Sequence, residues 1–236
     1  MRKHLALLGS FLFLLLLSGC FYPGKEEENF STLTFQVQTV QSAVDRYFKQ
    51  TGSLPLIENS GERFLYEKNA IDFGKLYPQY LSSLPTNSFE KGGHYRYVLY
   101  LNGEEIAVKL IDLTLSSAVG ELQLKINDFF QREGILPMKR GPNLYQYEID
   151  YEKLGIKKPA LNSPFTGKPL SFALSPKGEV FIDYAPDLMQ YKEKGYTGKG
   201  EDAREILIEN SYFVPVKSFP YRWIKGEPVL SMDLPR

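Results

Sequence analysis

The sequence has few of the side chains that most enzyme and metal sites use. Among its 236 residues there are one cysteine and two histidines, Cys20, His4 and His94. A single cysteine cannot form a disulfide within the chain and excludes a Cys-rich zinc site. The 28 basic residues are balanced by 28 acidic ones, so the composition does not indicate binding to nucleic acid. We therefore expect no cofactor, no metal and no nucleic-acid partner.

The apolar run near the start of the chain, Leu5 to Leu17, is also short. A membrane-spanning helix needs about 20 apolar residues, whereas a secretory signal peptide needs fewer. The run follows basic residues and ends in Leu17-Ser18-Gly19-Cys20, which resembles the bacterial lipobox. That resemblance implies cleavage between Gly19 and Cys20 and a diacylglyceryl group on the Cys20 thiol. We expect a protein held by lipid on the extracytoplasmic face of the cytoplasmic membrane.

The chain after Cys20 contains an internal repeat. Five apolar residues recur 82 positions later with the same helical spacing. They are Val37, Val40, Val44, Tyr47 and Phe48, followed by Val119, Leu122, Ile126, Phe129 and Phe130. Both predicted helices end at a glycine, Gly52 or Gly134, which begins a Gly-x-Leu-Pro motif.

Further blocks follow in the same order at falling offsets. Ile71-Asp72-Phe73 corresponds to Ile149-Asp150-Tyr151, and Asn87-Ser88 to Asn162-Ser163. Each copy then shows an apolar run, a turn at Gly103 or Gly178, and a second run, which predicts a β-hairpin. Both the turns and the strands after them are expected to correspond at an offset of 75 residues.

These patterns predict an α+β fold of two tandem helix-plus-antiparallel-hairpin units followed by a β-rich tail. The expected organisation is a signal peptide at 1–19, a lipidated cysteine and tether at 20–32, and three further segments. We call 33–113 the first repeat, 114–185 the second repeat and 186–236 the C-terminal extension. In the extension, the sequence around Ile206 fits a short helix or a strand, and residues 221–230 predict a last hairpin.

Two resemblances rest on these motifs. The lipobox with the duplicated Gly-x-Leu-Pro, Ile-Asp-aromatic and Asn-Ser blocks resembles an uncharacterised lipoprotein family of Gram-positive, spore-forming bacteria. In addition, Tyr47 to Pro55 and Leu76 to Pro85 resemble the globular part of type II secretion pseudopilins, which implies a pilin-like fold for each repeat. The chain lacks the long apolar first half of a pilin helix and carries the lipobox instead.

Few residues suggest catalysis. His94 has no second histidine or cysteine to work with after the signal peptide, and we expect it in an exposed turn. Ser88-Phe89-Glu90-Lys91 fits S-x-x-K, but the partner motifs of penicillin-recognising enzymes are absent. Gly195 to Gly200 is glycine-rich without the dinucleotide-binding order, so we expect a flexible loop.

The close carboxylate pairs are expected to be solvated surface charge, with a hydrolytic pair or a Ca²⁺ site as alternatives. These pairs are Glu104-Glu105, Glu148/Asp150, Asp183/Asp187 and Glu201-Asp202.

The aromatic residues of the extension leave two interpretations open. They form part of the core of a small sheet, or an exposed surface for a partner. The candidate surface residues are Tyr212, Phe219, Tyr221 and Trp223.

The function expected is a non-catalytic binding or assembly module at the cell envelope, with an envelope protein or polymer as partner. One alternative is a carboxylate-dependent hydrolase or transferase that acts on envelope polymers. The other is a pseudopilin-like structural component of an export machine.

Overall fold

A computed structural model of the chain describes residues 30–58, 61, 64–103, 105–143, 145–196, 198 and 200–233. The predicted signal peptide, the lipid site at Cys20 and the tether before residue 30 lie outside the described residues. The chain divides into two compact units, 1–34 and 35–236, and helix α2, Phe30–Thr51, begins in the first and continues in the second. Among the described residues, no helix is both long and apolar enough to cross a membrane.

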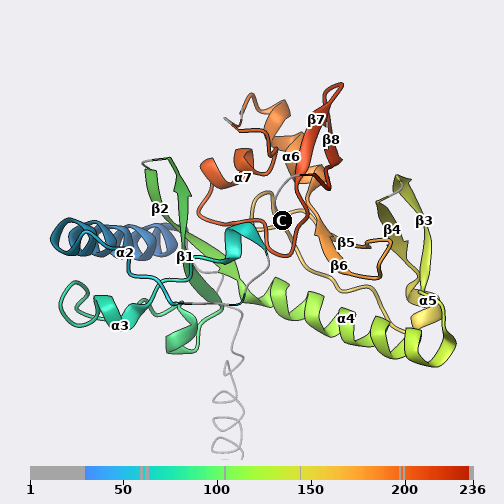
Figure 1. Ribbon diagram of the computed structural model, residues 1–236, viewed down its shortest axis with the longest axis horizontal. Helices are drawn as coiled ribbons and strands as arrows, with labels where there is room; N and C mark the ends of the chain where they lie inside the picture. The colour runs from blue at the N-terminus through green and yellow to red at the C-terminus, as the bar shows by residue number, and fades with distance from the viewer. Residues whose placement is uncertain are drawn as a thin grey trace, which may run out of the picture. The chain divides into compact units, whose positions relative to one another are not determined.

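Residues 35–236 mix helices with antiparallel hairpins, which confirms the α+β class (Figure 1). After α2 come the 3₁₀ helix η2, the short helix α3 and the 3₁₀ helix η3. The hairpin β1–β2 then leads directly into the long helix α4. Their bounds are Leu65–Glu67 for η2, Phe73–Leu76 for α3, Phe89–Lys91 for η3, Tyr95–Asn102 for β1, Glu105–Asp112 for β2 and Leu113–Glu133 for α4.

A four-stranded antiparallel sheet with the order β3-β4-β5-β6 follows α4, with the short helix α5 between β4 and β5. The extension contains helices α6 and α7 and the hairpin β7–β8. The bounds are Met138–Asn143 for β3, Gln146–Ile149 for β4, Tyr151–Leu154 for α5, Ser171–Leu174 for β5, Val180–Asp183 for β6, Ala185–Glu193 for α6, Glu205–Glu209 for α7, Tyr221–Ile224 for β7 and Glu227–Leu230 for β8.

Local sequence explains where the long helices begin and end. The Asp112 carboxylate accepts a hydrogen bond from Thr114 N at 2.8 Å and caps α4. At the other end Gly134 has a φ of 70°, a backbone conformation that residues with a Cβ rarely adopt. Its N–H donates to Phe130 O. Gly52 ends α2 in the same way, so the predicted glycine stops of both helices are confirmed.

Two parts of the chain differ from expectation, and one open alternative is resolved. The segment between α4 and α5, for which we predict no strand, forms strands β3 and β4. The extension is not β-rich, since α6 and α7 precede its single hairpin and α6 was not expected. Residues 205–209 form a helix rather than a strand, whereas the predicted hairpin at 221–230 is confirmed as β7–β8.

Helix and hairpin are joined by the same glutamine contact in both repeats. Gln41 Nε2 donates to Ile106 O at 3.0 Å, and Val108 N donates to Gln41 Oε1 at 2.7 Å. Gln123, 82 positions later, makes the same pair of bonds to Gly178 O at 2.9 Å and Val180 N at 2.7 Å. Each glutamine therefore occupies two backbone groups on the outer edge of a hairpin.

The strand pairing also corresponds. The bridge between Leu56 and Ile71 has its counterpart in Met138 with Ile149, and Asp72 N and Asp150 N each donate to a proline carbonyl at 2.8 Å. The glutamine contacts place the second strands, β2 and β6, at an offset of 72 residues. The predicted offset of 75 residues for these strands is therefore wrong. The second hairpin is three residues shorter than the first between the turn and the glutamine contact.

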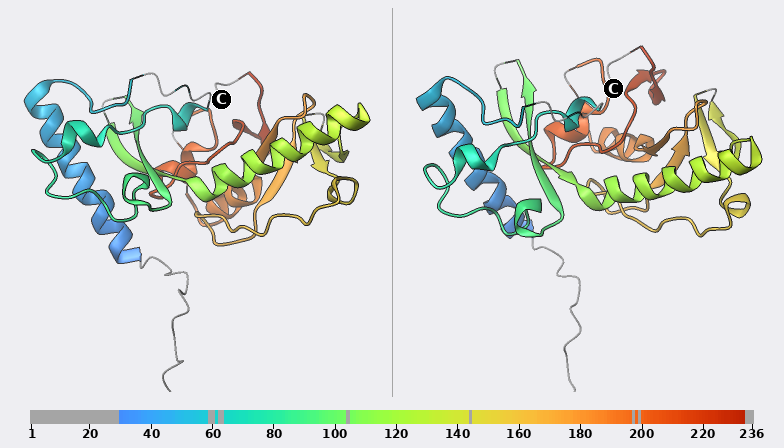
Figure 2. Two further views of the ribbon diagram at one scale, coloured as in Figure 1. Left: turned by 90° about the horizontal axis from the view of Figure 1, so that it is seen from below. Right: turned by 60° about the horizontal axis from the view of Figure 1, so that its bottom comes forward.

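The extension completes both hairpin edges. Leu110 N donates to Tyr212 O at 2.8 Å, and Ile182 N donates to Lys217 O at 3.0 Å. Residues 212–217 thus pass from the edge of β2 to the edge of β6, two positions beyond the glutamine contacts. Figure 2 shows the two hairpins with their helices, α2 and α4, and the extension beside them. One large group of buried apolar side chains combines residues of both repeats and of the extension, such as Ile111, Phe181 and Phe219.

We predict that Gln123→Ala lowers the free energy of unfolding by about 1–3 kcal/mol, because it leaves the N–H of buried Val180 without a hydrogen bond. Chemical denaturation monitored by circular dichroism measures this. Gln131→Ala, at an exposed position of the same helix, is the matched control and should change stability by less than about 0.5 kcal/mol. Equal stability of the two variants would show that the glutamine contact contributes nothing.

Candidate functional site

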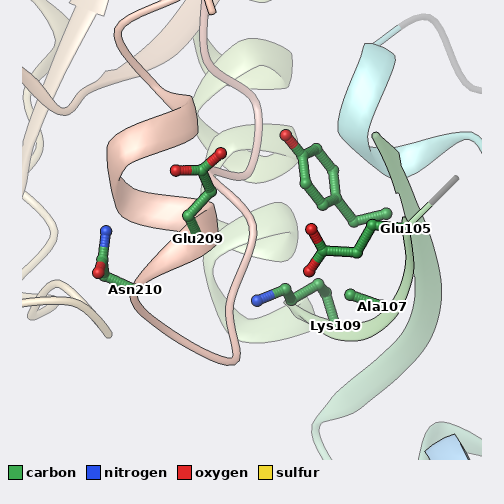
Figure 3. Close-up of a pocket in the computed structure, with 6 residues that line it drawn as sticks. Glu105, Ala107, Lys109, Glu209 and Asn210 are labelled. Atoms are coloured by element: carbon green, nitrogen blue, oxygen red, sulfur yellow. The ribbon is translucent and has the colours of Figure 1, made fainter. Parts of the chain in front are cut away.

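A polar pocket of about 260 Å³ lies between the β1–β2 hairpin and helix α7. Alternate residues of β2 point to the same face, so positions 105, 107 and 109 face the pocket together. Figure 3 shows the carboxylates of Glu105 and Glu209 on opposite sides of the space, with the Lys109 side chain entering it. The lining residues are Tyr100, Glu105, Ala107, Lys109, Glu209 and Asn210.

Lys109 connects the hairpin to the extension. Its ammonium donates to the carbonyls of Ile208 and Ser211, both at 2.6 Å, where α7 ends. Burial lowers the pKa of Lys109 to about 8, although Glu105 and Glu209 favour the charged form. An amine with this pKa could act as a base, but its protons are directed at backbone carbonyls.

A buried ion pair lies beyond this pocket. Arg204, 1% exposed, is bound by Asp202 through Nε at 2.9 Å and Nη2 at 2.6 Å, and its Nη1 donates to Ser218 O. The guanidinium lies over the ring of Tyr66 at 4.8 Å, and the Tyr66 hydroxyl donates to Asp202. Burial, and then the charge of Asp202, raises the pKa of Tyr66. The extension is thereby fixed to η2 of the first repeat.

The glycine-rich segment packs against α7. Burial, and then Asp202 and Glu209, raise the pKa of Glu205, and the Gly200 N–H donates to its carboxylate. A Cβ on Gly200 would lie 2.2 Å from that carboxylate, so a side chain there would displace it. Gly200 thus has a packing role, while Thr197 and Lys199 lie outside the described residues.

A second hollow, of about 300 Å³, lies in the first repeat near α3. Its lining is mostly apolar, with carboxylates at Asp72 and Glu90. Ile57 and Tyr77 are 45% and 50% exposed at its walls. We call this hollow the α3 groove. Its lining residues are Ile57, Ile71, Asp72, Phe73, Gly74, Tyr77, Leu84 and Glu90.

Two of the four aromatic residues considered for a partner surface are buried. Phe219 and Tyr221 are each 1% exposed, so their assignment to the surface is wrong and they belong to the core. The Tyr221 hydroxyl donates to Asp183 at 2.7 Å. Tyr212 and Trp223 are half-buried, and the Lys192 ammonium lies 4.7 Å from the centre of the Trp223 ring.

The carboxylates at 183, 187 and 202 are not the solvated surface charge that we expected. Asp183 accepts bonds from Gln146 and Tyr221, and Asp187 from Thr166, while Asp202 is paired with Arg204. Burial raises the pKa of Asp187 against the hydrogen bonds from Ser163 and Thr166. Within the described part of the chain, no three His, Cys, Asp or Glu residues are grouped so that they could hold a metal ion.

The remaining candidates lie apart from the polar pocket. His94 is exposed, as expected for a turn. Ser88 of the S-x-x-K match is 0% exposed, so its hydroxyl cannot reach a substrate. Among the members of the close carboxylate pairs that the structure describes, only Glu105 reaches the polar pocket. Its partner across the space, Glu209, is 104 positions away, and no sequence spacing indicated that the two would meet.

Comparison with known proteins finds one similarity. Residues 33–112 match the YphF family N-terminal domain. The match ends at Asp112, the residue that caps α4. No curated protein and no solved structure was found to match the chain. The similarity therefore covers the α3 groove and the hairpin side of the polar pocket.

We predict that the charge on Lys109 makes stability depend on pH. The unfolded chain holds this proton up to a pKa of about 10.4 and the folded chain only to about 8, so stability should rise with pH between these values. From pH 8 to 9.5 the gain should be about 1.5 kcal/mol. Urea denaturation at several pH values measures it.

Lys109→Met should lack most of that rise, whereas Lys125→Met, at an exposed position of α4, should retain it. A rise of the same size in Lys109→Met would assign the pH dependence to another group.

Proposed function

We propose that this protein is a lipid-anchored, extracytoplasmic, non-catalytic binding or assembly module at the cell envelope. The observation that carries the proposal is the α3 groove, which is open, mostly apolar and edged by two carboxylates. The motif Leu17-Ser18-Gly19-Cys20 supports lipid attachment, and the preceding basic and apolar residues support export. A module that binds a partner needs an accessible surface such as this hollow, and it needs no reacting group.

Two candidate nucleophiles, Ser88 and Lys109, are used by the fold, which favours binding over catalysis. The Ser88 hydroxyl is buried, and the Lys109 ammonium is directed at two carbonyls. A catalytic nucleophile needs access to a substrate and an adjacent base. Neither residue meets both conditions.

The duplicated contacts support an origin of this module from two related units, 33–113 and 114–185. Gln41 and Gln123 close equivalent strand edges, and Asp72 and Asp150 follow equivalent bridges. The likeness of Tyr47 to Pro55 to pseudopilins suggests a pilin-like fold for each unit. On this proposal the units form a scaffold for recognition, and a pilus is not assembled.

The proposal is tested in intact cells with the tagged full chain and its Cys20→Ser variant. The native chain should incorporate radiolabelled fatty acid, and crosslinking followed by purification should recover a reproducible envelope partner. Cys20→Ser should lose both label and partner, because the thiol that receives the lipid is gone. Undiminished labelling, or recovery of the same proteins from both chains, would contradict the proposal.

A second candidate, a carboxylate-dependent hydrolase, is favoured by one observation: Glu105 and Glu209 line the same pocket. General acid–base hydrolysis needs two carboxylates across a cleft. A sensitive test is the release of reducing ends from purified cell-wall glycan by the full chain. The binding proposal predicts no release. Release that disappears in both Glu105→Gln and Glu209→Gln would establish the hydrolase instead.

A further inference from the structure

The α3 groove has a chemical character that the second repeat helps to interpret. We propose that it binds a polypeptide segment of a partner protein in which a lysine or arginine stands next to an aliphatic side chain. This inference rests on the proposed binding function and names the chemistry of its partner. Two corners of the chain, at Asp72 and at Asp150, occupy equivalent places after the bridges Leu56–Ile71 and Met138–Ile149.

In the second repeat, this corner is neutralised from within the chain. Lys139 Nζ lies 3.4 Å from one carboxylate oxygen of Asp150, and Lys153 Nζ lies 3.9 Å from the other. Burial acts to raise the pKa of Asp150, but the hydrogen bonds from Lys153 N and Lys139 outweigh it, and the pKa lies below its usual value. A lysine beside this carboxylate is therefore part of the second repeat's own structure.

In the first repeat, no described cation pairs with the corresponding carboxylate, Asp72. Ile57 stands where the second repeat has Lys139. Lys75 corresponds to Lys153, but its ammonium donates to Leu56 O at 2.9 Å. Among the described residues, no lysine or arginine lies within ion-pair distance of the Asp72 carboxylate. That carboxylate accepts a hydrogen bond from Gly74 N. A cation from outside can therefore take the place that Lys139 occupies beside Asp150.

The surroundings of Asp72 add an apolar requirement. Ile71 and Phe73 are buried at the base of the groove, and Tyr77 and Ile57 stand exposed at its walls. The second repeat has Gly155 in place of Tyr77, with no side chain to form a wall. An aliphatic side chain in the groove would cover these exposed apolar surfaces, which contributes about 25 cal/mol per Å² buried.

Glu90 strengthens the preference for a cation. It lines the groove together with Asp72, so two carboxylates face the same hollow. The corresponding residue of the second repeat is Phe165, whose ring packs on Tyr184 at 5.5 Å. A volume of about 300 Å³ is at the small end of ligand sites, so one or two side chains fill it and the affinity should be weak. An acidic or uncharged segment would leave both carboxylates without a counter-charge.

The test uses the full chain in detergent with ¹³C-labelled isoleucine methyl groups. The probes are acetyl-Gly-Leu-Lys-Gly-amide and its matched partner acetyl-Gly-Leu-Glu-Gly-amide. The lysine peptide should produce saturable methyl shifts at Ile57 and Ile71 with a dissociation constant between about 0.1 and 5 mM, weak as one or two anchoring side chains imply. Ile182 in β6 should not shift. Equal shifts with both peptides, or none at 10 mM, would overturn the inference.

Two variants separate charge recognition from damage to the fold. Asp72→Asn keeps the helix cap, since Asn and Asp cap equally well, and should weaken binding about tenfold. Asp112→Asn, the same change at the cap of α4, should bind as the unaltered chain does. Ile57→Lys introduces the lysine of the second repeat and should abolish binding, because its ammonium would occupy the place of the partner's cation beside Asp72. Unchanged binding in Asp72→Asn or Ile57→Lys would refute the groove as a cation site.

The outcomes also distinguish this inference from the proposed function. If the crosslinked partner is recovered equally by Asp72→Asn, Ile57→Lys and the unaltered chain, the module binds through another surface and the groove is excluded. If the peptide binds in the groove but Cys20→Ser changes neither labelling nor partner recovery, the chemistry of the groove stands and the lipid-anchored function fails.

Discussion

The closing of two sheet edges is the constraint on which the rest of the structure depends. An edge strand exposes unpaired backbone groups, and a short hairpin alone is barely stable in water. Here a glutamine from the packed helix binds one stretch of each edge, and residues of the extension bind the next. Because residues 212–217 serve both hairpins, the extension cannot leave without exposing both edges. The two repeats and the extension consequently share one large group of buried side chains.

The buried charges around the extension follow from that arrangement. Residues that reach the edges of β2 and β6 must pass over apolar surface, which buries Arg204 of the extension and Lys109 of β2. A buried charge is costly unless it is paired and fully hydrogen-bonded. Asp202 and Ser218 O satisfy Arg204, while the carbonyls of Ile208 and Ser211 satisfy Lys109. These contacts select one position for the extension, although pairs of this kind add little net stability.

Local patterns predicted the parts of the fold that local forces determine. Apolar spacing and glycine stops located α2 and α4, and glycine turns located the hairpins.

The patterns failed where a distant partner decides the outcome. Strand β3 carries lysine, arginine and proline at the edge of the sheet, so it lacks the alternation that identifies a strand, and β4 has only four residues. The sequence predicts surface charge at Asp183, Asp187 and Asp202 because it does not show their hydrogen-bond donors. Most of these donors, including Tyr221, are distant in the chain, and Arg204 pairs with Asp202 only through the fold of the local backbone. Glu209 reaches the polar pocket only through the docking of α7, which no spacing in the sequence reveals.

The corresponding contacts of residues 33–113 and 114–185 offer a way to separate structural residues from functional ones without any ligand. Where both repeats keep a residue and its contact, as with Gln41 and Gln123, the fold requires it in both places. Where the geometry is kept but the chemistry differs, the fold alone cannot explain the difference.

Asp72 and Asp150 each cap a short helix after equivalent bridges. Asp150 pairs with two lysines, whereas Asp72 lies beside an isoleucine and an open apolar hollow. The fold shows that it tolerates a closed, neutralised corner, since the second repeat has one. The open corner of the first repeat lies in the part of the chain that matches the YphF family N-terminal domain, and this is where we expect recognition to occur.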